Sequence, residues 1–254
     1  MSNAYRTKNS TGLINKNKKI NFSFNGHTYH GYEGDTLASA LISNGIHLIG
    51  RSFKYHRPRG FLGVGVEEPN AMVQLHEGNK SEPNIMATEV ELVEGLKAKS
   101  QNCWPSVQFD IGEVNNLLNR FFPAGFYYKT FMWPKSFWMK IYEPFIRKAA
   151  GMGVAPLQPD PDRYEHNYEH CDVLVVGSGP SGLASALAAA KNGARVILAE
   201  DKPNFGGSLL TDEVTIGNMS GKEWANDTVA QLKSLPNVLL KKRSQVFGYY
   251  DHNM

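Results

Sequence analysis

The sequence predicts two modules of mixed α and β structure: an α+β module of the β-grasp type, then an incomplete α/β module of the Rossmann type. Residues 18–102 hold a hairpin, a short helix and returning strands, in that order. Residues 171–254 begin with an apolar strand, a glycine-rich turn and a helix of small residues. Residues 103–170 hold an aromatic segment and a proline-rich linker, and residues 1–17 form a polar tail.

The composition excludes several classes of function. The 254 residues carry 27 basic and 24 acidic side chains, and a net charge of +3 is too small for an extended nucleic-acid surface. The N-terminus has no apolar signal region, and no window of the sequence is apolar enough to span a membrane. Cys103 and Cys171 have no metal-ligand spacing. We therefore expect a reducing, cytoplasmic compartment in which both thiols are structural.

The first module shows its elements through turn and cap signals. Asn25-Gly26 joins two short strands within INFSFNGHTYHGYEG and is typical of a tight hairpin turn. In GDTLASALISNG we expect a helix that Asp35 caps and that Asn44-Gly45 ends in the left-handed conformation. The stretches NAMVQLHEG and NIMATEVELVEG are predicted to be further strands. This order favours a β-grasp module.

The segment Val114–Gly151 is dense in aromatic side chains, and Pro123, Pro134 and Pro144 are expected to cut it into short helical pieces. So much apolar surface seldom stays in water. The favoured interpretation is a segment that wraps over the domain cores. A subunit interface is the first alternative and a membrane-surface anchor the second. The polar linker Ala155–His170 follows.

The turn GSGPSG carries the most specific chemistry of the chain. Gly177 permits the tight turn, Gly179 lets the backbone approach a pyrophosphate, and Gly182 lets the helix pack closely on the strand. The helix that starts at Ser181 points free N–H groups and its positive dipole end at the phosphates. A degenerate scaffold that binds no nucleotide is the alternative.

The second strand, ARVILAED, ends in Glu200, whose carboxylate can accept hydrogen bonds from both adenosine-ribose hydroxyls. A carboxylate there disfavours the 2′-phosphate of NADP and favours NAD or FAD, with Asp201 as the fallback. The pair Gly206-Gly207 is typical of flavoprotein folds with two dinucleotide-binding domains, although an ordinary turn is the alternative. The predicted cofactor contacts are Gly177, Gly179, Ser181, Gly182, Glu200, Asp201, Lys202, Gly207, Ser208 and Val246, the last against adenine.

Several long motifs make the chain resemble a known family, the α subunit of heterotetrameric sarcosine oxidase. They are GYEGDTLASAL, GRSFKYHRPRG, EEPNA, FYYKTFMWPKSFW, YEPFIRKAAG, GSGPSG, FGGSLL and FGYYDHN. The resemblance implies an α subunit that carries NAD as a bound component, with β, γ and δ subunits as partners. It also implies FAD in β and FMN at the α/β boundary. Sarcosine would be oxidised at the FAD, with electrons passing to oxygen and the one-carbon unit to tetrahydrofolate on a C-terminal domain of α.

The resemblance also bears on the first module, which looks like the ferredoxin-type module of related amine and opine dehydrogenases. Those proteins carry cysteines at C-x4-C-x2-C in the loop after the helix. Here Leu62, Glu67 and Asn70 stand at that spacing, and none of them is a thiolate ligand. We therefore expect a ferredoxin-like scaffold without an iron–sulfur cluster.

The loop RSFKYHRPRG, Arg51–Gly60, concentrates basic side chains. A phosphate or nucleic acid could bind such a loop. The near-neutral chain instead favours a loop held by salt bridges at a domain interface, and a contact with the dinucleotide or a neighbouring subunit is the sharper alternative.

No catalytic acid, base, nucleophile or metal constellation stands out, so the chemistry is expected from flavins on partner subunits. The sequence ends inside the nucleotide-binding fold as the family has it, which predicts an N-terminal part of the α subunit without activity of its own. The nearest rival is the α subunit of a related amine or opine dehydrogenase. A rival of another class is a non-catalytic module whose Rossmann unit binds nothing.

Overall fold

The computed structural model describes residues 5–7, 12–121, 124–125, 129, 131–149 and 153–251. The chain divides into two compact units, one with Ile14–Arg163 and the other with Tyr164–Met254. The boundary falls inside the proline-rich linker, whose residues 155–170 are irregular and exposed.

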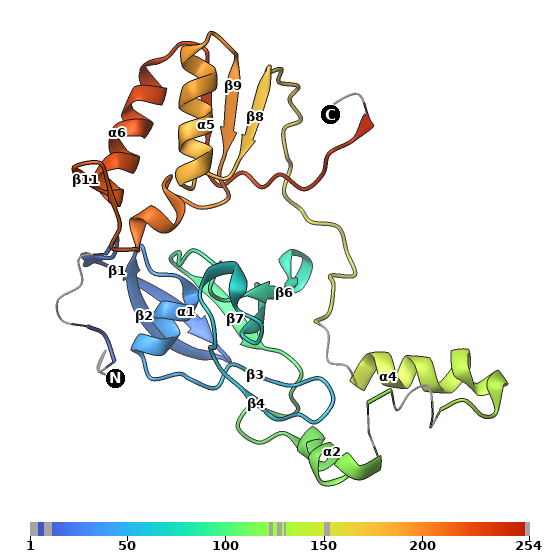
Figure 1. The fold of residues 1–254 in the computed structure, drawn as a ribbon. Coiled ribbons are helices and arrows are strands. Elements are labelled where there is room, and N and C mark those ends of the chain that lie inside the picture. Colours follow the sequence, from blue (N-terminus) through green and yellow to red (C-terminus); the bar gives the residue numbers. More distant parts are fainter. Residues whose placement is uncertain are drawn as a thin grey trace. The chain divides into compact units, whose positions relative to one another are not determined.

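The first unit is built on a five-stranded sheet in the order β2-β1-β7-β5-β6 (Figure 1). β1 is antiparallel to β2 and parallel to β7, and β5 is antiparallel to both β6 and β7. This mixed sheet, with one helix packed on its core, agrees with the predicted β-grasp arrangement. The strands are β1 (Asn15–Phe24), β2 (His27–Glu33), β5 (Met72–Leu75), β6 (Glu82–Met86) and β7 (Leu96–Ser100), and a separate pair is formed by β3 (Gly50–Arg51) and β4 (Pro58–Arg59).

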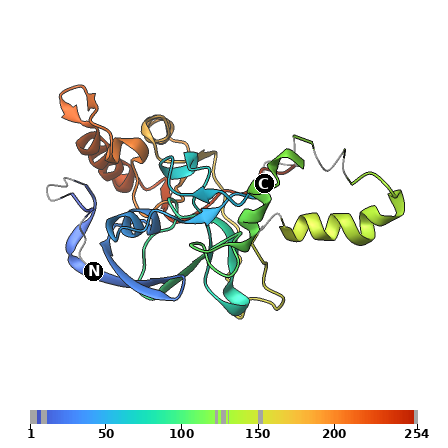
Figure 2. The same ribbon diagram turned by 90° about the horizontal axis from the view of Figure 1, so that it is seen from below.

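The hairpin of β1 and β2, blue in Figures 1 and 2, turns at Asn25 and Gly26, which both have positive φ as predicted. Helix α1 (Leu37–Ser43) ends at Asn44, and Gly45 has a φ of 79°. These two predictions are confirmed, because both turns are set by local backbone chemistry.

The predicted cap of α1 was wrong by one residue. Thr36 is the N-cap, and its hydroxyl accepts a hydrogen bond from the Ser39 amide. The Asp35 carboxylate is buried and accepts instead from the Arg6 guanidinium, over 2.7 Å, and from the Ser39 hydroxyl. Asp35 therefore forms a tertiary ion pair with Arg6 and does not cap the N-terminus of α1.

The last strand predicted for this module, NIMATEVELVEG, is a strand only as far as Met86. The backbone beyond it turns toward the start of α1. The carbonyls of Ala87 and Val90 accept hydrogen bonds from the Ala38 and Leu37 amides over 3.0 and 2.9 Å. Ala87 and Val90 are buried, but their carbonyls satisfy the first turn of a helix instead of continuing a strand.

The connector, residues 103–170, carries short helical pieces, including α2 (Val114–Leu117), η5 (Lys135–Phe137), the wider turn η6 (Trp138–Tyr142) and α4 (Glu143–Ala149). Pro134 immediately precedes η5, as predicted. Pro144 is the second residue of α4, and the change from η6 to α4 falls beside it, so this proline also marks a boundary between helical pieces. Pro123 lies outside the described residues.

Large apolar side chains of the connector are exposed, which is not what a segment wrapped over domain cores would show. The exposed set is Met132, Trp133, Phe137, Met139, Ile141 and Phe145. Among the helices that the structure describes, none is long and apolar enough to cross a membrane.

The second unit is a three-stranded parallel sheet in the order β12-β9-β8, which is the 3-2-1 half of a Rossmann fold. Helices α5 and α6 pack on it around a core that includes Leu183, Leu198 and Leu232 (Figure 1). Leu174 and Val176 of β8 remain exposed. The elements are β8 (Val173–Val176), α5 (Pro180–Lys191), β9 (Val196–Ala199), β10 (Thr215–Ile216), β11 (Met219–Ser220), α6 (Gly221–Ser234) and β12 (Val238–Lys241).

Candidate dinucleotide site

The glycine turn between β8 and α5 has the backbone geometry that the fingerprint predicts. Gly177 has a φ of 86°, a conformation that other residues seldom adopt. A Cβ atom on Gly182 would lie 2.0 Å from the Gly177 carbonyl oxygen, so the first turn of α5 packs directly on the strand end. Gly179 is the N-cap of α5, and a Cβ atom there would meet nothing within 4 Å.

The turn at Gly206-Gly207 lies against this glycine turn. The Gly206 amide donates to the Ser178 carbonyl over 3.1 Å, and a Cβ atom on Gly207 would lie 2.9 Å from the Gly179 Cα atom. Both glycines have positive φ. The sequence left open whether this pair was an ordinary turn, and the structure places it beside the glycine turn that follows β8. Ser208 follows it in the short helix η7 (Gly207–Leu210) and is exposed.

Glu200 lies at the carboxyl end of β9, and its side chain is turned toward the glycine turn. One carboxylate oxygen accepts from the Ser178 amide over 2.8 Å and from the Ser178 hydroxyl, and the other accepts from the Lys202 amide over 3.0 Å. Burial alone would raise the pKa of Glu200, but hydrogen bonds from Asp201, Ser178 and Lys202 lower it below its ordinary value. Glu200 is therefore a buried, negatively charged acceptor.

The contact between Ser178 and Glu200 was not predicted. Ser178 occupies the unspecified position between the first two glycines of the fingerprint, where sequence spacing carries no signal. Protein donors fill three of the roughly four acceptor positions of the Glu200 carboxylate. The side chain of Asp201 also contacts the Glu200 carboxylate, so a ribose hydroxyl has at most the position that Asp201 approaches, where the sequence predicted two.

The remaining predicted contacts lie around the same end of the sheet or beyond it. Asp201 is exposed, and burial together with the adjacent Glu200 raises its pKa. Burial lowers the pKa of Lys202. Ser181 is exposed in the first turn of α5, and Val246 is exposed in the irregular segment after β12.

These residues fit the pyrophosphate and adenosine ribose of a dinucleotide. The space before Gly179 is open, the N-terminus of a 12-residue helix faces it, and a charged carboxylate lies at the end of the next strand. The chain thus brings Gly177, Gly179, Gly182 and Glu200 into one site. The place of Val246 against adenine stays a prediction.

The ferredoxin-type module does not fit the group that its fold implies. A [2Fe–2S] cluster takes four thiolates in the usual case, and the whole chain has two cysteines. Leu62 is 77% exposed, and Glu67 and Asn70 carry no sulfur. No group of three His, Cys, Asp or Glu side chains suited to a metal ion occurs in the part of the chain that the structure describes.

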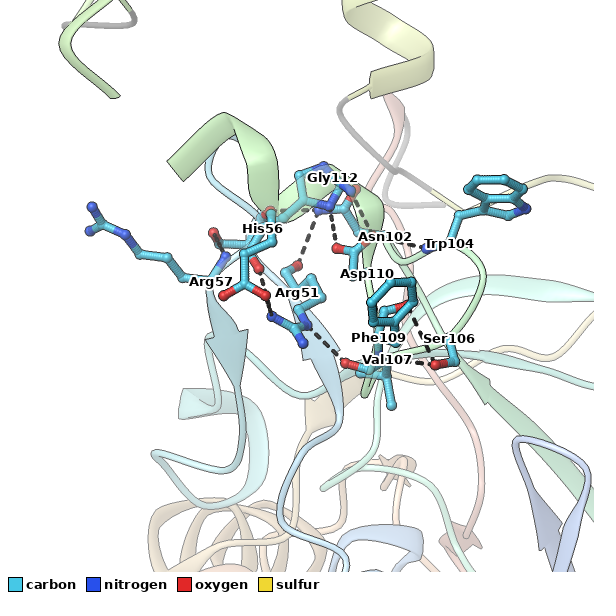
Figure 3. A network of polar contacts seen from close by, with 12 residues as sticks. Arg51, His56, Arg57, Asn102, Trp104, Ser106, Val107, Phe109, Asp110 and Gly112 are labelled. Carbon is cyan, nitrogen blue, oxygen red and sulfur yellow. Dashed lines mark hydrogen bonds and ion pairs between the residues drawn. The ribbon is translucent and has the colours of Figure 1, made fainter. Parts of the chain in front are cut away.

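The basic loop is tied down by buried polar contacts, as Figure 3 shows. Arg51 is buried and donates to the Val107 carbonyl over 2.8 Å and to the Glu113 carboxylate over 3.1 Å. His56 lies 2.6 Å from the Asp110 carboxylate. These contacts join the loop to residues 102–113 within the first unit. The predicted salt bridges are confirmed for Arg51, which pairs with Glu113, while His56 hydrogen-bonds to Asp110. The position at a domain interface and a contact with the dinucleotide stay predictions.

Comparison with known proteins matches both modules. A family model described as a 2Fe-2S iron-sulfur cluster binding domain matches residues 17–103, and one described as FAD dependent oxidoreductase matches residues 172–234. L-proline dehydrogenase from P. horikoshii aligns with 97% of this chain and 36% of its own, with a TM-score of 0.52 and 18% identity, which shows a shared fold.

Sarcosine oxidase subunit alpha of Rhizobium meliloti (strain 1021) is 55% identical over 243 residues, which make up 96% of this chain and 25% of that protein. The same subunit of Corynebacterium sp. (strain U-96) is 30% identical over 94% of this chain and 20% of that protein.

The chain thus holds one region similar to 2Fe-2S iron-sulfur cluster binding domains and one similar to FAD dependent oxidoreductases. More particularly, the chain is homologous to sarcosine oxidase α subunits. It spans about a quarter of the length of the R. meliloti relative, since the aligned region is 25% of that protein.

Proposed function

We propose that the second unit binds NAD through its glycine turn, as the nucleotide-carrying part of a sarcosine oxidase α subunit. The observation that carries the proposal is the open space at Gly179, framed by the N-terminus of α5 and the Glu200 carboxylate. The N–H groups at the start of α5 would hold the pyrophosphate, and the Glu200 carboxylate would accept a hydrogen bond from one ribose hydroxyl at the position that Asp201 approaches.

The same geometry accepts the ADP half of either NAD or FAD, so the choice between them rests on the homology. A carboxylate at Glu200 disfavours a 2′-phosphate, which argues against NADP. NAD bound here would be a retained component of the subunit. The residues of this site orient and hold the nucleotide, and no side chain among them is placed as an acid or base for turnover.

The activity that we propose for the whole complex is oxidative demethylation of sarcosine to glycine. FAD and FMN would lie with partner subunits, electrons would pass to oxygen, and the one-carbon unit would pass to tetrahydrofolate. The partners would be β, γ and δ subunits. The strong identity to sarcosine oxidase α subunits over nearly the whole chain supports this activity over that of an amine or opine dehydrogenase.

The connector supplies a surface for one of these partners. Trp133 is 82% exposed and Met139 is 72% exposed. Side chains of this size and apolarity are enriched where proteins meet. We therefore assign the segment to a subunit interface, the first alternative that the sequence had offered.

Native mass spectrometry of the purified 254-residue chain, with and without added NAD, tests the nucleotide proposal. Denaturation then releases any bound cofactor for identification by mass. NAD in the native chain, absent from the Gly179→Val variant, supports the proposal. FAD in its place would overturn the choice of nucleotide, and a folded chain that takes up neither would favour the empty scaffold.

A further inference from the structure

The loop Leu62–Ala71 of the ferredoxin-type module is closed by a side chain that the ligand spacing does not include. Glu68 lies between the second and third positions of that spacing, next to Glu67. It is 2% exposed, whereas Leu62 and Val66 of the same loop are 77% and 70% exposed. A buried carboxylate in an otherwise exposed loop requires an explanation, since burying a charge is costly unless it is well hydrogen-bonded.

Four backbone amides converge on this carboxylate, two from each end of the loop. One oxygen accepts from the Leu62 and Gly63 amides over 2.7 and 2.8 Å. The other accepts from the Asn70 and Ala71 amides over 2.7 and 3.1 Å. All four acceptor positions of the side chain are thus filled by backbone N–H groups.

These amides form the kind of concave N–H array that binds anions, including iron–sulfur clusters, in other proteins. Burial alone would raise the pKa of Glu68, but the amides of Gly63, Leu62, Asn70 and Ala71 lower it below its ordinary value. The loop therefore holds Glu68 as a charged anion and gives it the hydrogen bonds that a bound anion would receive.

We infer that the Glu68 carboxylate takes the place of an anionic cluster at the centre of this loop. The inference rests on the proposal that the module holds no cluster, which the lack of thiolates at Leu62, Glu67 and Asn70 supports. Glu68 closes the loop without metal, and the exposed tip carries the aliphatic side chains of Leu62, Val64 and Val66. On this inference the loop is held closed by Glu68, and the module has no electron carrier at that position.

The test compares Glu68→Gln and Glu68→Ala in the full chain with Glu67→Gln, a matched control at the neighbouring exposed residue. Glutamine turns an NH2 group toward two amide donors, so Glu68→Gln is expected to lower Tm by about 5–10 °C, and Glu67→Gln by almost nothing. Thermolysin, which cuts before aliphatic residues, should gain cleavage at Leu62, Val64 and Val66 in the Glu68 variants alone.

Small carboxylates give the decisive readout. The Glu68→Ala variant leaves four amides around an empty site, so added formate or acetate should restore both Tm and protease resistance. Chloride at equal ionic strength should restore less. Rescue by formate supports the inference. Failure of rescue, or a Glu68→Gln protein as stable and resistant as Glu67→Gln, would overturn it.

Metal analysis separates this inference from the proposal beneath it. Stoichiometric iron and acid-labile sulfide in the parent chain would overturn the cluster-free module itself. A parent chain free of iron, together with Glu68 variants that behave as the control does, would leave the cluster-free module standing and reject only the role of Glu68.

Discussion

The Ser178 amide donates a hydrogen bond to the Glu200 carboxylate over 2.8 Å, and this contact joins the glycine turn after β8 to the carboxyl end of β9. The second oxygen of Glu200 accepts from the Lys202 amide. One side chain therefore fixes both the glycine turn and the backbone that leaves the neighbouring strand. A residue predicted only as a ribose acceptor also sets the shape of the site.

Replacing Glu200 by glutamine should weaken NAD binding through both roles. The new NH2 group would face either the Ser178 or the Lys202 amide, and the charge would be lost. A charge-assisted hydrogen bond contributes about 1.5–3 kcal/mol, so Kd should rise roughly tenfold to a hundredfold. Isothermal titration with NAD measures this directly. Asp201→Asn is the control and should raise Kd less, since the glycine turn donates no bond to Asp201. A larger rise in Kd for Asp201→Asn than for Glu200→Gln would indicate that Asp201 makes the ribose contact.

Gly179→Val should abolish nucleotide retention without unfolding the chain. Gly179 has extended backbone angles that valine can adopt, and a Cβ atom there meets nothing within 4 Å. The added methyl groups would occupy the space for the pyrophosphate. Gly182→Val is the contrasting variant, because its Cβ atom would lie 2.0 Å from the Gly177 carbonyl oxygen and should disrupt the fold itself.

Circular dichroism and cofactor release distinguish these two outcomes. The expected pair is a folded, empty Gly179→Val protein and a destabilised Gly182→Val protein. Nucleotide retained at the parental level by Gly179→Val would reject the assigned site.

The contribution of Glu68 to stability should depend on pH with a definite sign. Its pKa is lowered in the folded chain, so its stabilising contribution is complete above the ordinary carboxyl range and is lost as pH falls through the lowered value. Urea unfolding of the parent and of Glu68→Gln should differ by a constant amount near neutral pH, and the two should converge in acid. A difference that grows as pH falls would contradict the charged, hydrogen-bonded state of Glu68.

Local chemistry explains what the sequence could predict. Asn25-Gly26 and Asn44-Gly45 specify positive φ angles, and the spacing of Gly177, Gly179 and Gly182 specifies a turn, so each element follows from a few adjacent residues. The three-stranded parallel sheet follows in turn from a strand, helix and strand pattern.

Tertiary contacts explain why the sequence could not predict the roles of two acidic residues. Asp35 has the chemistry of a cap, but Arg6, distant in sequence, takes its carboxylate, and Thr36 caps the helix. Glu68 is one acid beside another, and only the closed loop shows that it is buried while Glu67 is exposed. Both roles depend on partners that no spacing rule names.

Asp110 provides a further test, because it carries the network that ties the basic loop to the connector (Figure 3). Its buried carboxylate accepts from the Trp104 and Gly112 amides over 3.0 and 3.1 Å and lies 2.6 Å from His56 Nδ1. Asp110→Ala leaves these donors without an acceptor, and the free energy of unfolding should fall by about 3 kcal/mol. Urea unfolding followed by tryptophan fluorescence, to which Trp104 contributes, measures the loss.

The matched control is Glu113→Gln, which breaks the ion pair of Arg51 at a half-exposed carboxylate and should cost less than about 1 kcal/mol. Arg51 keeps its bonds to the carbonyls of Val107 and Gln108 in that variant, so the loop stays anchored. The ratio of the two losses is the informative quantity. A loss at Asp110 no greater than that at Glu113 would mean that backbone pairing of β3 and β4, rather than this network, holds the basic loop in place.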